Sequence, residues 1–191
     1  MYTWKGRECE RAYFIPKDPM TPAQMAHRQV FGAMSSLGAA MLQIAKIGLR
    51  GIAAERQTTE KNVFVRMNKQ SVRLVDGEVV IDYPNLQVAD GPLAPVAFGA
   101  PATDDGRLVR ATFTNTGDPA GYRFDYVILA AYVPQKRNCA LSQPVYRSTG
   151  MAELLLPQVW TGCEAHIYGF CWDGDSNASP SCYLGTVNTA Q

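Results

Sequence analysis

The stretch from residue 20 to residue 49 constrains the fold most, because it joins a helix-start signal to a regular apolar stripe. Thr21 is a helix-capping residue type, Pro22 suits the first helical position, and Gln24 completes a capping box three residues after Thr21. Apolar side chains then recur at alternating spacings of four and three residues, which places them along one buried face of a helix. The members of this stripe are Val30, Met34, Leu37, Met41 and Ile44. We therefore predict a long helix that buries one face against protein.

The predicted helix runs over residues 22–48 or 22–51, with a bend near residues 35–38, where helix propensity falls. A second, shorter helix is expected over residues 58–69, with a threonine as its cap. Whether the stripe packs within the chain or between chains is left open by the sequence.

Residues 1–20 are expected to form an extended arm, because Pro16 and Pro19 exclude a helix there. So short an arm has too little apolar surface to bury on its own, and we expect it to lie on its own sandwich or on a neighbour. The aromatic and basic residues of the arm that we expect at a protein interface are Trp4, Lys5, Arg7, Arg11, Tyr13, Phe14 and Lys17.

From Val72 onward the apolar pattern changes to a period of two, which favours strands separated by short polar turns such as Asp76-Gly77. The predicted strands cover residues 79–83, 86–88, 95–98, 108–114, 124–133, 145–148, 152–156, 164–172 and 181–186. We therefore predict an α+β fold in two domains. An arm and helical module occupies residues 1–71, and an antiparallel immunoglobulin- or fibronectin-like β-sandwich occupies residues 72–191.

The net charge of +1 hides a division between the two parts of the chain. Residues 1–73 hold 12 Lys and Arg against 5 Asp and Glu, whereas residues 74–191 hold 6 against 12. This asymmetry fits complementary protein surfaces, a nucleic-acid contact, or chance segregation on an ordinary surface. Because the basic residues are spread out and not run together, a nucleic-acid partner is not expected.

The sequence contains no run of about 18 apolar residues and no apolar signal-peptide core, so neither a membrane span nor export is expected. The five cysteines cannot all pair, and buried free thiols are the expectation. For Cys171 and Cys182 two states stay open: a disulfide across a predicted hairpin, or two neighbouring reduced thiols in the core.

The sequence gives only weak indications of a catalytic or metal-binding site. Cys163, His166 and Cys171 have a spacing that suggests zinc, but in a strand His166 would point away from both cysteines. The loop 173–177 resembles the start of a calcium loop without its later glycine and glutamate, and an ordinary turn explains it better. No nucleophile elbow, phosphate loop or dinucleotide fingerprint is present. We therefore expect no enzyme, no metal and no cofactor.

Short motifs spread over nearly the whole chain carry a family resemblance: residues 4–7, 21–24 with Arg28 and Phe31, 47–51, 81–83 and 181–185. Together they resemble an uncharacterised family of Bacteroidetes proteins of similar length, whose function is unknown. The helix start, Thr-Pro-x-Gln followed by Arg and Phe, is also similar to a motif of small bacteriophage and prophage structural proteins. That second similarity implies a virion or assembly component.

The predicted function is that of a non-enzymatic structural subunit, in a phage or prophage virion assembled in the bacterial cytoplasm, or else a cytoplasmic protein. It would form an oligomer with itself or with other particle subunits by burying the helix stripe, anchoring the arm, and pairing the arm's basic groups with an acidic patch on an adjacent sandwich. One alternative is a binding module whose sandwich recognises a glycan or cell-surface partner. Another is a monomer whose helices cover one open face of its own sheet.

Overall fold

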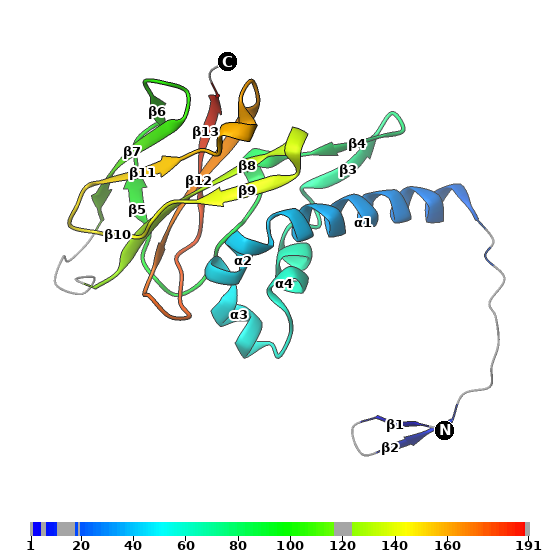
Figure 1. The fold of residues 1–191 in the computed structure, drawn as a ribbon. Coiled ribbons are helices and arrows are strands. Elements are labelled where there is room, and N and C mark those ends of the chain that lie inside the picture. The colour runs from blue at the N-terminus through cyan, green and yellow to red at the C-terminus, as the bar shows by residue number, and fades with distance from the viewer. Residues whose placement is uncertain (1, 5–6, 11–17, 19, 117–123, 190–191) are drawn as a thin grey trace.

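The computed structural model describes residues 2–4, 7–10, 18, 20–116 and 124–189. Figure 1 shows two packed β-sheets with a group of helices on one outer side. The fold is therefore α+β, as predicted, with antiparallel sheets. The helices are α1 (Pro22–Ala40), α2 (Leu42–Gly48), α3 (Arg50–Glu55) and α4 (Glu60–Met67).

A central sheet has the strand order β10-β8-β12-β13, with β9 beside β8 on the same side as β10. Its strands are β8 (Tyr126–Val133), β9 (Asn138–Leu141), β10 (Val145–Tyr146), β12 (Glu164–Trp172) and β13 (Cys182–Asn188). An outer sheet has the order β11-β7-β5, with β6 also on β7. Its strands are β5 (Val96–Phe98), β6 (Ala102–Thr103), β7 (Leu108–Asn115) and β11 (Met151–Leu155).

Strands β8 and β12 are buried on both faces. Ile167 and Cys171 of β12 pack between the two sheets, with Phe113 of the outer sheet in the same apolar cluster. Tyr168 and Phe170, on the opposite face of β12, pack against the helices. Both strands are almost continuously apolar in sequence, as strands covered on two sides usually are. The molecule therefore has three layers: outer sheet, central sheet and helices.

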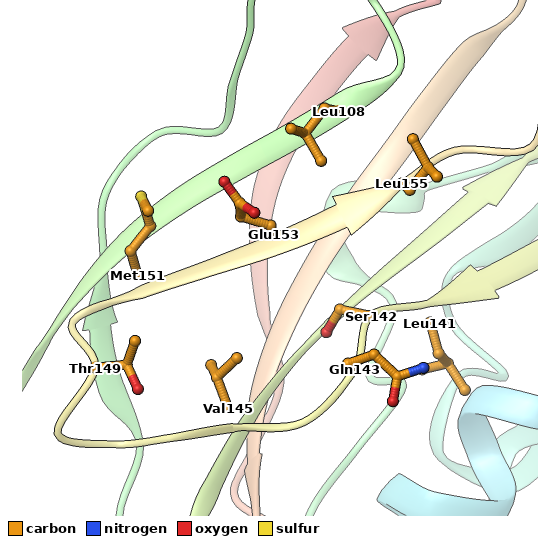
Figure 2. Close-up of a pocket in the computed structure, with 9 residues that line it drawn as sticks. All are labelled: Leu108, Leu141, Ser142, Gln143, Val145, Thr149, Met151, Glu153 and Leu155. Atoms are coloured by element: carbon orange, nitrogen blue, oxygen red, sulfur yellow. The ribbon is translucent and has the colours of Figure 1, made fainter.

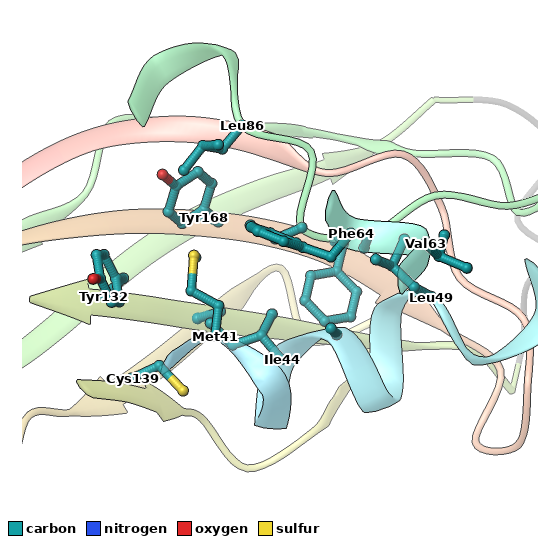
Figure 3. Packing of buried hydrophobic residues seen from close by; sticks show 14 of the residues in the cluster. Met41, Ile44, Leu49, Val63, Phe64, Leu86, Tyr132, Cys139 and Tyr168 are labelled. Atoms are coloured by element: carbon teal, nitrogen blue, oxygen red, sulfur yellow. The ribbon is translucent and has the colours of Figure 1, made fainter. Parts of the chain in front are cut away.

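The predicted helix stripe lies mainly inside this chain. Met34, Leu37, Met41 and Ile44 are all at most 3% exposed, and only Val30 is half-buried. Figure 3 shows Met41 and Ile44 beside Phe64, Tyr132 and Tyr168, in the layer between helices and central sheet. Burial in the chain's own core removes Leu37, Met41 and Ile44 from any docking surface, and it leaves Met34 only 2% exposed at the base of a groove. That is a correction to the expectation that the stripe binds a neighbour.

The predicted bend lies further along the chain than expected. Helix α1 continues through residues 35–38 and ends at Ala40, and α2 begins at Leu42 at an angle of 73° to it. Gly38 serves helix packing instead, because a Cβ at that position would lie 3.2 Å from the Phe64 ring of α4. The low helix propensity of Gly38 is therefore explained by a close contact between α1 and α4, and not by a kink.

The second predicted helix is confirmed as α4, whose cap is Thr59: its side-chain oxygen accepts a hydrogen bond from Asn62 N–H at 3.3 Å. Within the described residues no single helix has the length and apolar character of a membrane span. The pair α1–α2 reaches that length and character only when counted across its 73° bend.

Most predicted strands are present, and the run 164–172 coincides with β12. The turn Asp76-Gly77 closes a hairpin of β3 (Val72–Val75) and β4 (Glu78–Ile81), which packs on α1 and joins neither large sheet. Residues 86–88 are not a strand. The N–H of Gln87 binds the Asn68 side chain at 2.7 Å and that of Val88 binds Ser181 Oγ at 3.0 Å, so side chains replace a strand ladder there.

Replacing Ile44 with alanine should test the placement of α2 in the core. Ile44 is fully buried, so Ile44→Ala should lower the free energy of unfolding by about 3 kcal/mol. Lys46→Ala, on the exposed side of the same helix, should change it by less than about 0.5 kcal/mol. Urea unfolding followed by circular dichroism measures both, and equal small effects would contradict the three-layer core.

Candidate protein interface

The start of α1 is fixed by local interactions and not by burial. Thr21 Oγ1 accepts from Gln24 N–H at 3.4 Å, and Gln24 Oε1 accepts from Thr21 N–H at 3.3 Å, which confirms the predicted capping box. Arg28 also forms an ion pair with Asp18. Because isolated helix ends are only marginally stable in water, these bonds hold in place a segment that packing does not.

Apolar side chains are exposed on this helix start. Phe31 is 58% exposed and stacks on His27, and Met25 is also exposed. A groove of about 320 Å³ lies beside them, between the helix start and the α4 region. Its lining residues are His27, Val30, Phe31, Met34, Val65, Lys69 and Gln70. We name Met25, Val30, Phe31 and this groove the helix-start patch.

The β3–β4 hairpin adds further apolar surface near the helix-start patch. Val75, Val79 and Val80 are all exposed, and both strands of the hairpin contact α1. A two-stranded hairpin is barely stable alone, so its packing on α1 is what supports it.

The predicted arm residues are only partly within the described chain. The backbones of Trp4 and Arg7 pair in register in a short antiparallel hairpin of β1 (Tyr2–Trp4) and β2 (Arg7–Cys9), which Figure 1 draws apart from the main body. The other predicted interface residues of the arm lie outside the described residues: Lys5, Arg11, Tyr13, Phe14 and Lys17. The role of the arm therefore stays a prediction.

A second groove, of about 650 Å³, lies at the open side of the sandwich, between β11 and the β9–β10 segment (Figure 2). We name it the edge groove. Glu153, which lines this groove, pairs with Arg110 at 2.8 Å, and Arg110 also pairs with Asp104, so this cluster holds two negative charges and one positive charge. The lining residues are Leu108, Leu141, Ser142, Gln143, Val145, Thr149, Met151, Glu153 and Leu155.

His166 lies on the helix-facing side of the central sheet, away from the cysteines, as the strand alternation predicted. Its ring stacks on Tyr83 at a centroid distance of 4.0 Å, and its Nδ1 lies 3.0 Å from the Tyr183 hydroxyl. Cys163 and Cys171 pack on the opposite face, between the sheets. Across the described chain, no group of three His, Cys, Asp or Glu side chains is placed to hold a metal ion.

The disulfide hypothesis for Cys171 and Cys182 is wrong. Cys182 pairs with Gly169, two residues from the expected position, because the loop after β12 is longer than a simple hairpin. Within that loop Ser179 N–H donates to the Cys171 carbonyl and the chain then turns away. Both thiols are free, Cys171 buried and Cys182 exposed.

The loop 173–177 is an ordinary polar turn. Asp173 accepts from the N–H of Asp175 at 2.8 Å and of Asn177 at 3.1 Å, and from the Asn177 side-chain amide at 2.7 Å. Burial by itself would raise the pKa of Asp173, but these hydrogen bonds together outweigh burial and lower it. Its carboxylate therefore serves the turn itself.

Sequence reasoning missed the exposed apolar residues of the helix-start patch. Phe31 and Met25 lie off the predicted stripe, and an off-stripe aromatic on an amphipathic helix is the signal that could have found them. No comparable sequence pattern predicts the edge groove. Alternation of apolar and polar residues predicts a strand such as β11, but it does not show that the strand lies at the edge of its sheet.

These features define a class: an α+β protein with a helix layer on a β-sandwich and apolar side chains exposed at two grooves. Residues 2–185 match the model of the family of unknown function DUF6266, and the chain therefore belongs to that family. No curated protein and no solved structure matches it. The match confirms the expected family of unknown function over nearly the whole chain, while the bacterial group and the phage resemblance stay predictions.

Stability should depend on pH through His166. Burial lowers the pKa of His166 below its usual 6.5, so the unfolded chain takes up a proton first and stability falls as the pH drops through about 6.5. The Glu164 carboxylate opposes this effect in part. Thermal melting between pH 8 and pH 5 should show this loss, and His166→Gln should reduce the slope.

The chain's other histidine provides the control. His27 is exposed on α1, so His27→Gln should keep the full pH dependence. Equal slopes in the wild type and His166→Gln would show that the buried imidazole does not carry it.

Proposed function

We propose that this protein is a non-enzymatic structural subunit that assembles with other copies of itself. Its docking parts would be the helix-start patch and the residues that precede it. The observation that carries this proposal is the helix start: it is capped and ion-paired, yet it exposes Phe31 and Met25 and buries little of its own surface.

The capping box and the ion pair hold the helix start in one conformation, which lowers the free-energy cost of binding. A segment already held in its bound shape loses less conformational entropy on association. Covering a side chain such as Phe31, which is 58% exposed, contributes about 1.5 kcal/mol or more. A patch of a few such residues is the usual centre of a protein interface.

The charge division supports a head-to-tail contact between copies. The first 73 residues are basic in balance and the rest acidic, so the helical part of one copy and the sandwich of the next attract each other. A head-to-tail contact joins different surfaces of the two copies and produces rings or filaments. We further propose a phage or prophage particle as this assembly, on the helix-start motif alone, and detection of the chain in purified particles tests that step.

The strand connectivity supports a finer assignment of the sandwich to the immunoglobulin- or fibronectin-like arrangement, which we also propose. We count β5 with β6 as one interrupted strand, and β9 with β10 as another. The first, second and fifth strands then form the outer sheet, and the third, fourth, sixth and seventh form the central sheet. The first, second and fifth strands then correspond to A, B and E, and the third, sixth and seventh to C, F and G. The fourth strand lies in the central sheet here, whereas strand D lies beside A, B and E in an immunoglobulin constant domain.

Light scattering after size exclusion tests the assembly. The wild type should have a multiple of the 20.9 kDa chain mass at low salt and a smaller mass in high salt, because screening weakens charge attraction. Phe31→Glu and deletion of residues 1–20 should each give a single-chain mass.

Val159→Glu is the matched control, because Val159 is 71% exposed on the 3₁₀ turn η4 (Gln158–Trp160) and not in the helix-start patch. This variant should keep the wild-type mass. A wild type that is monomeric at both salt concentrations would overturn the proposed function.

A second candidate, a glycan-binding module, is favoured by one specific observation. Tyr126 stacks on the half-exposed Tyr146 at a centroid distance of 5.0 Å and lies 5.9 Å from the Trp172 ring. Neighbouring aromatic faces at a surface can stack on sugar rings. In that case a chain lacking residues 1–20 should retain glycan-array signal, and Tyr146→Ala should remove it.

A further inference from the structure

We propose that the edge groove receives the N-terminal segment of a second copy, residues 11–15, which adds a strand to the free edge of β11. This inference rests on the proposed function and names the receptor surface for it. The observation that carries it is a free strand edge beside an apolar groove that Glu153 also lines.

One side of β11 has main-chain groups free for pairing. The N–H of Leu156 donates to the Arg107 carbonyl, so residue 156 and every second residue before it direct their main-chain groups toward β7. The alternate residues Met151, Glu153 and Leu155 direct theirs to the other side. In the described part of the chain no hydrogen bond occupies these outward groups, and β11 is an end strand of its sheet.

The groove offers apolar side chains along this edge. Met151 and Leu155 are exposed, the latter by 62%, and Figure 2 shows them on β11 with Leu141 and Val145 on the facing segment. A strand edge with exposed apolar side chains is a ready template for an added strand. Pairing would satisfy the outward main-chain groups, and the groove would hold alternate side chains of the added segment.

Residues 11–15 match this site in length, character and charge. The segment reads Arg-Ala-Tyr-Phe-Ile and is followed by Pro16, which cannot donate to a ladder and so ends a strand. Its five residues equal the five of β11. It carries one positive charge and three large apolar side chains, whereas Glu153 of the groove belongs to a cluster with Asp104 and Arg110 whose net charge is negative.

The geometry favours a segment from another copy over the chain's own. Ile15 precedes Thr21 by six residues, a reach of about 20 Å when extended. Figure 1 shows the helix start and β11 at opposite ends of the molecule, and the 19 residues of α1 alone span about 29 Å. The segment therefore reaches the edge groove of a neighbour and not its own.

Glu153→Pro separates strand addition from simple contact. Proline removes the outward N–H of residue 153 and leaves the bonds to β7 intact, since those come from residues 152 and 154. Glu153→Thr is the matched control, because it loses the same carboxylate but keeps the N–H. A fluorescent peptide of residues 11–20 should bind the dilute full-length wild type, and Glu153→Pro should bind it about tenfold more weakly than Glu153→Thr does.

Equal affinity for the two variants, or no binding to the wild type, would overturn the edge-groove proposal. Circular dichroism melting of Glu153→Pro shows whether it is folded; if it is not, Leu155→Lys takes its place, with Val159→Lys as its control. Light scattering distinguishes the two proposals. A wild-type oligomer that Glu153→Pro leaves unchanged refutes the groove and keeps the proposed function. A monomeric wild type whose peptide binding still depends on residue 153 refutes the proposed function and keeps the groove.

Discussion

Burial of the β8–β12 pair on both faces is the constraint on which the rest of the structure depends. Alternate residues of β12 enter two separate apolar clusters, one shared with the outer sheet and one with the helices. A sheet with two apolar faces must have both faces covered by other elements. The helix layer therefore stabilises the sandwich by covering one face of the central sheet. Since Ile44 and Phe64 are fully buried there, removing the helices would expose the face that carries Tyr168 and Phe170.

That constraint divides α1 into two parts with different tasks. Its second half, from Met34, supplies core side chains, while its first turns have little core to cover and depend on the Thr21 capping box and the Asp18–Arg28 pair. A helix that extends past its own core with an exposed Phe31 is suited to contact another molecule. This division supports the proposed assembly, in which the buried Leu37, Met41 and Ile44 have no part.

Sequence patterns could predict those parts of the fold that depend on local chemistry. The helix start follows from the Thr21–Gln24 box, and β12 follows from a continuous apolar run. Features that depend on distant partners were not predictable. Gly38 packs on α4 where a bend was expected, and the offset of Cys182 depends on loop path. The edge groove exists because topology leaves β11 unpaired on one side, which no local pattern encodes.

Hydrogen exchange along α1 at two protein concentrations tests the central claim most directly. In dilute samples, amides after Met34 should exchange only through global unfolding, while those before residue 30 should exchange quickly. At concentrations where copies associate, the first turns should gain protection and the second half should not change. Strong protection of the first turns in dilute monomer, or uniform fast exchange along all of α1, would contradict the division of α1 into a core half and a docking half.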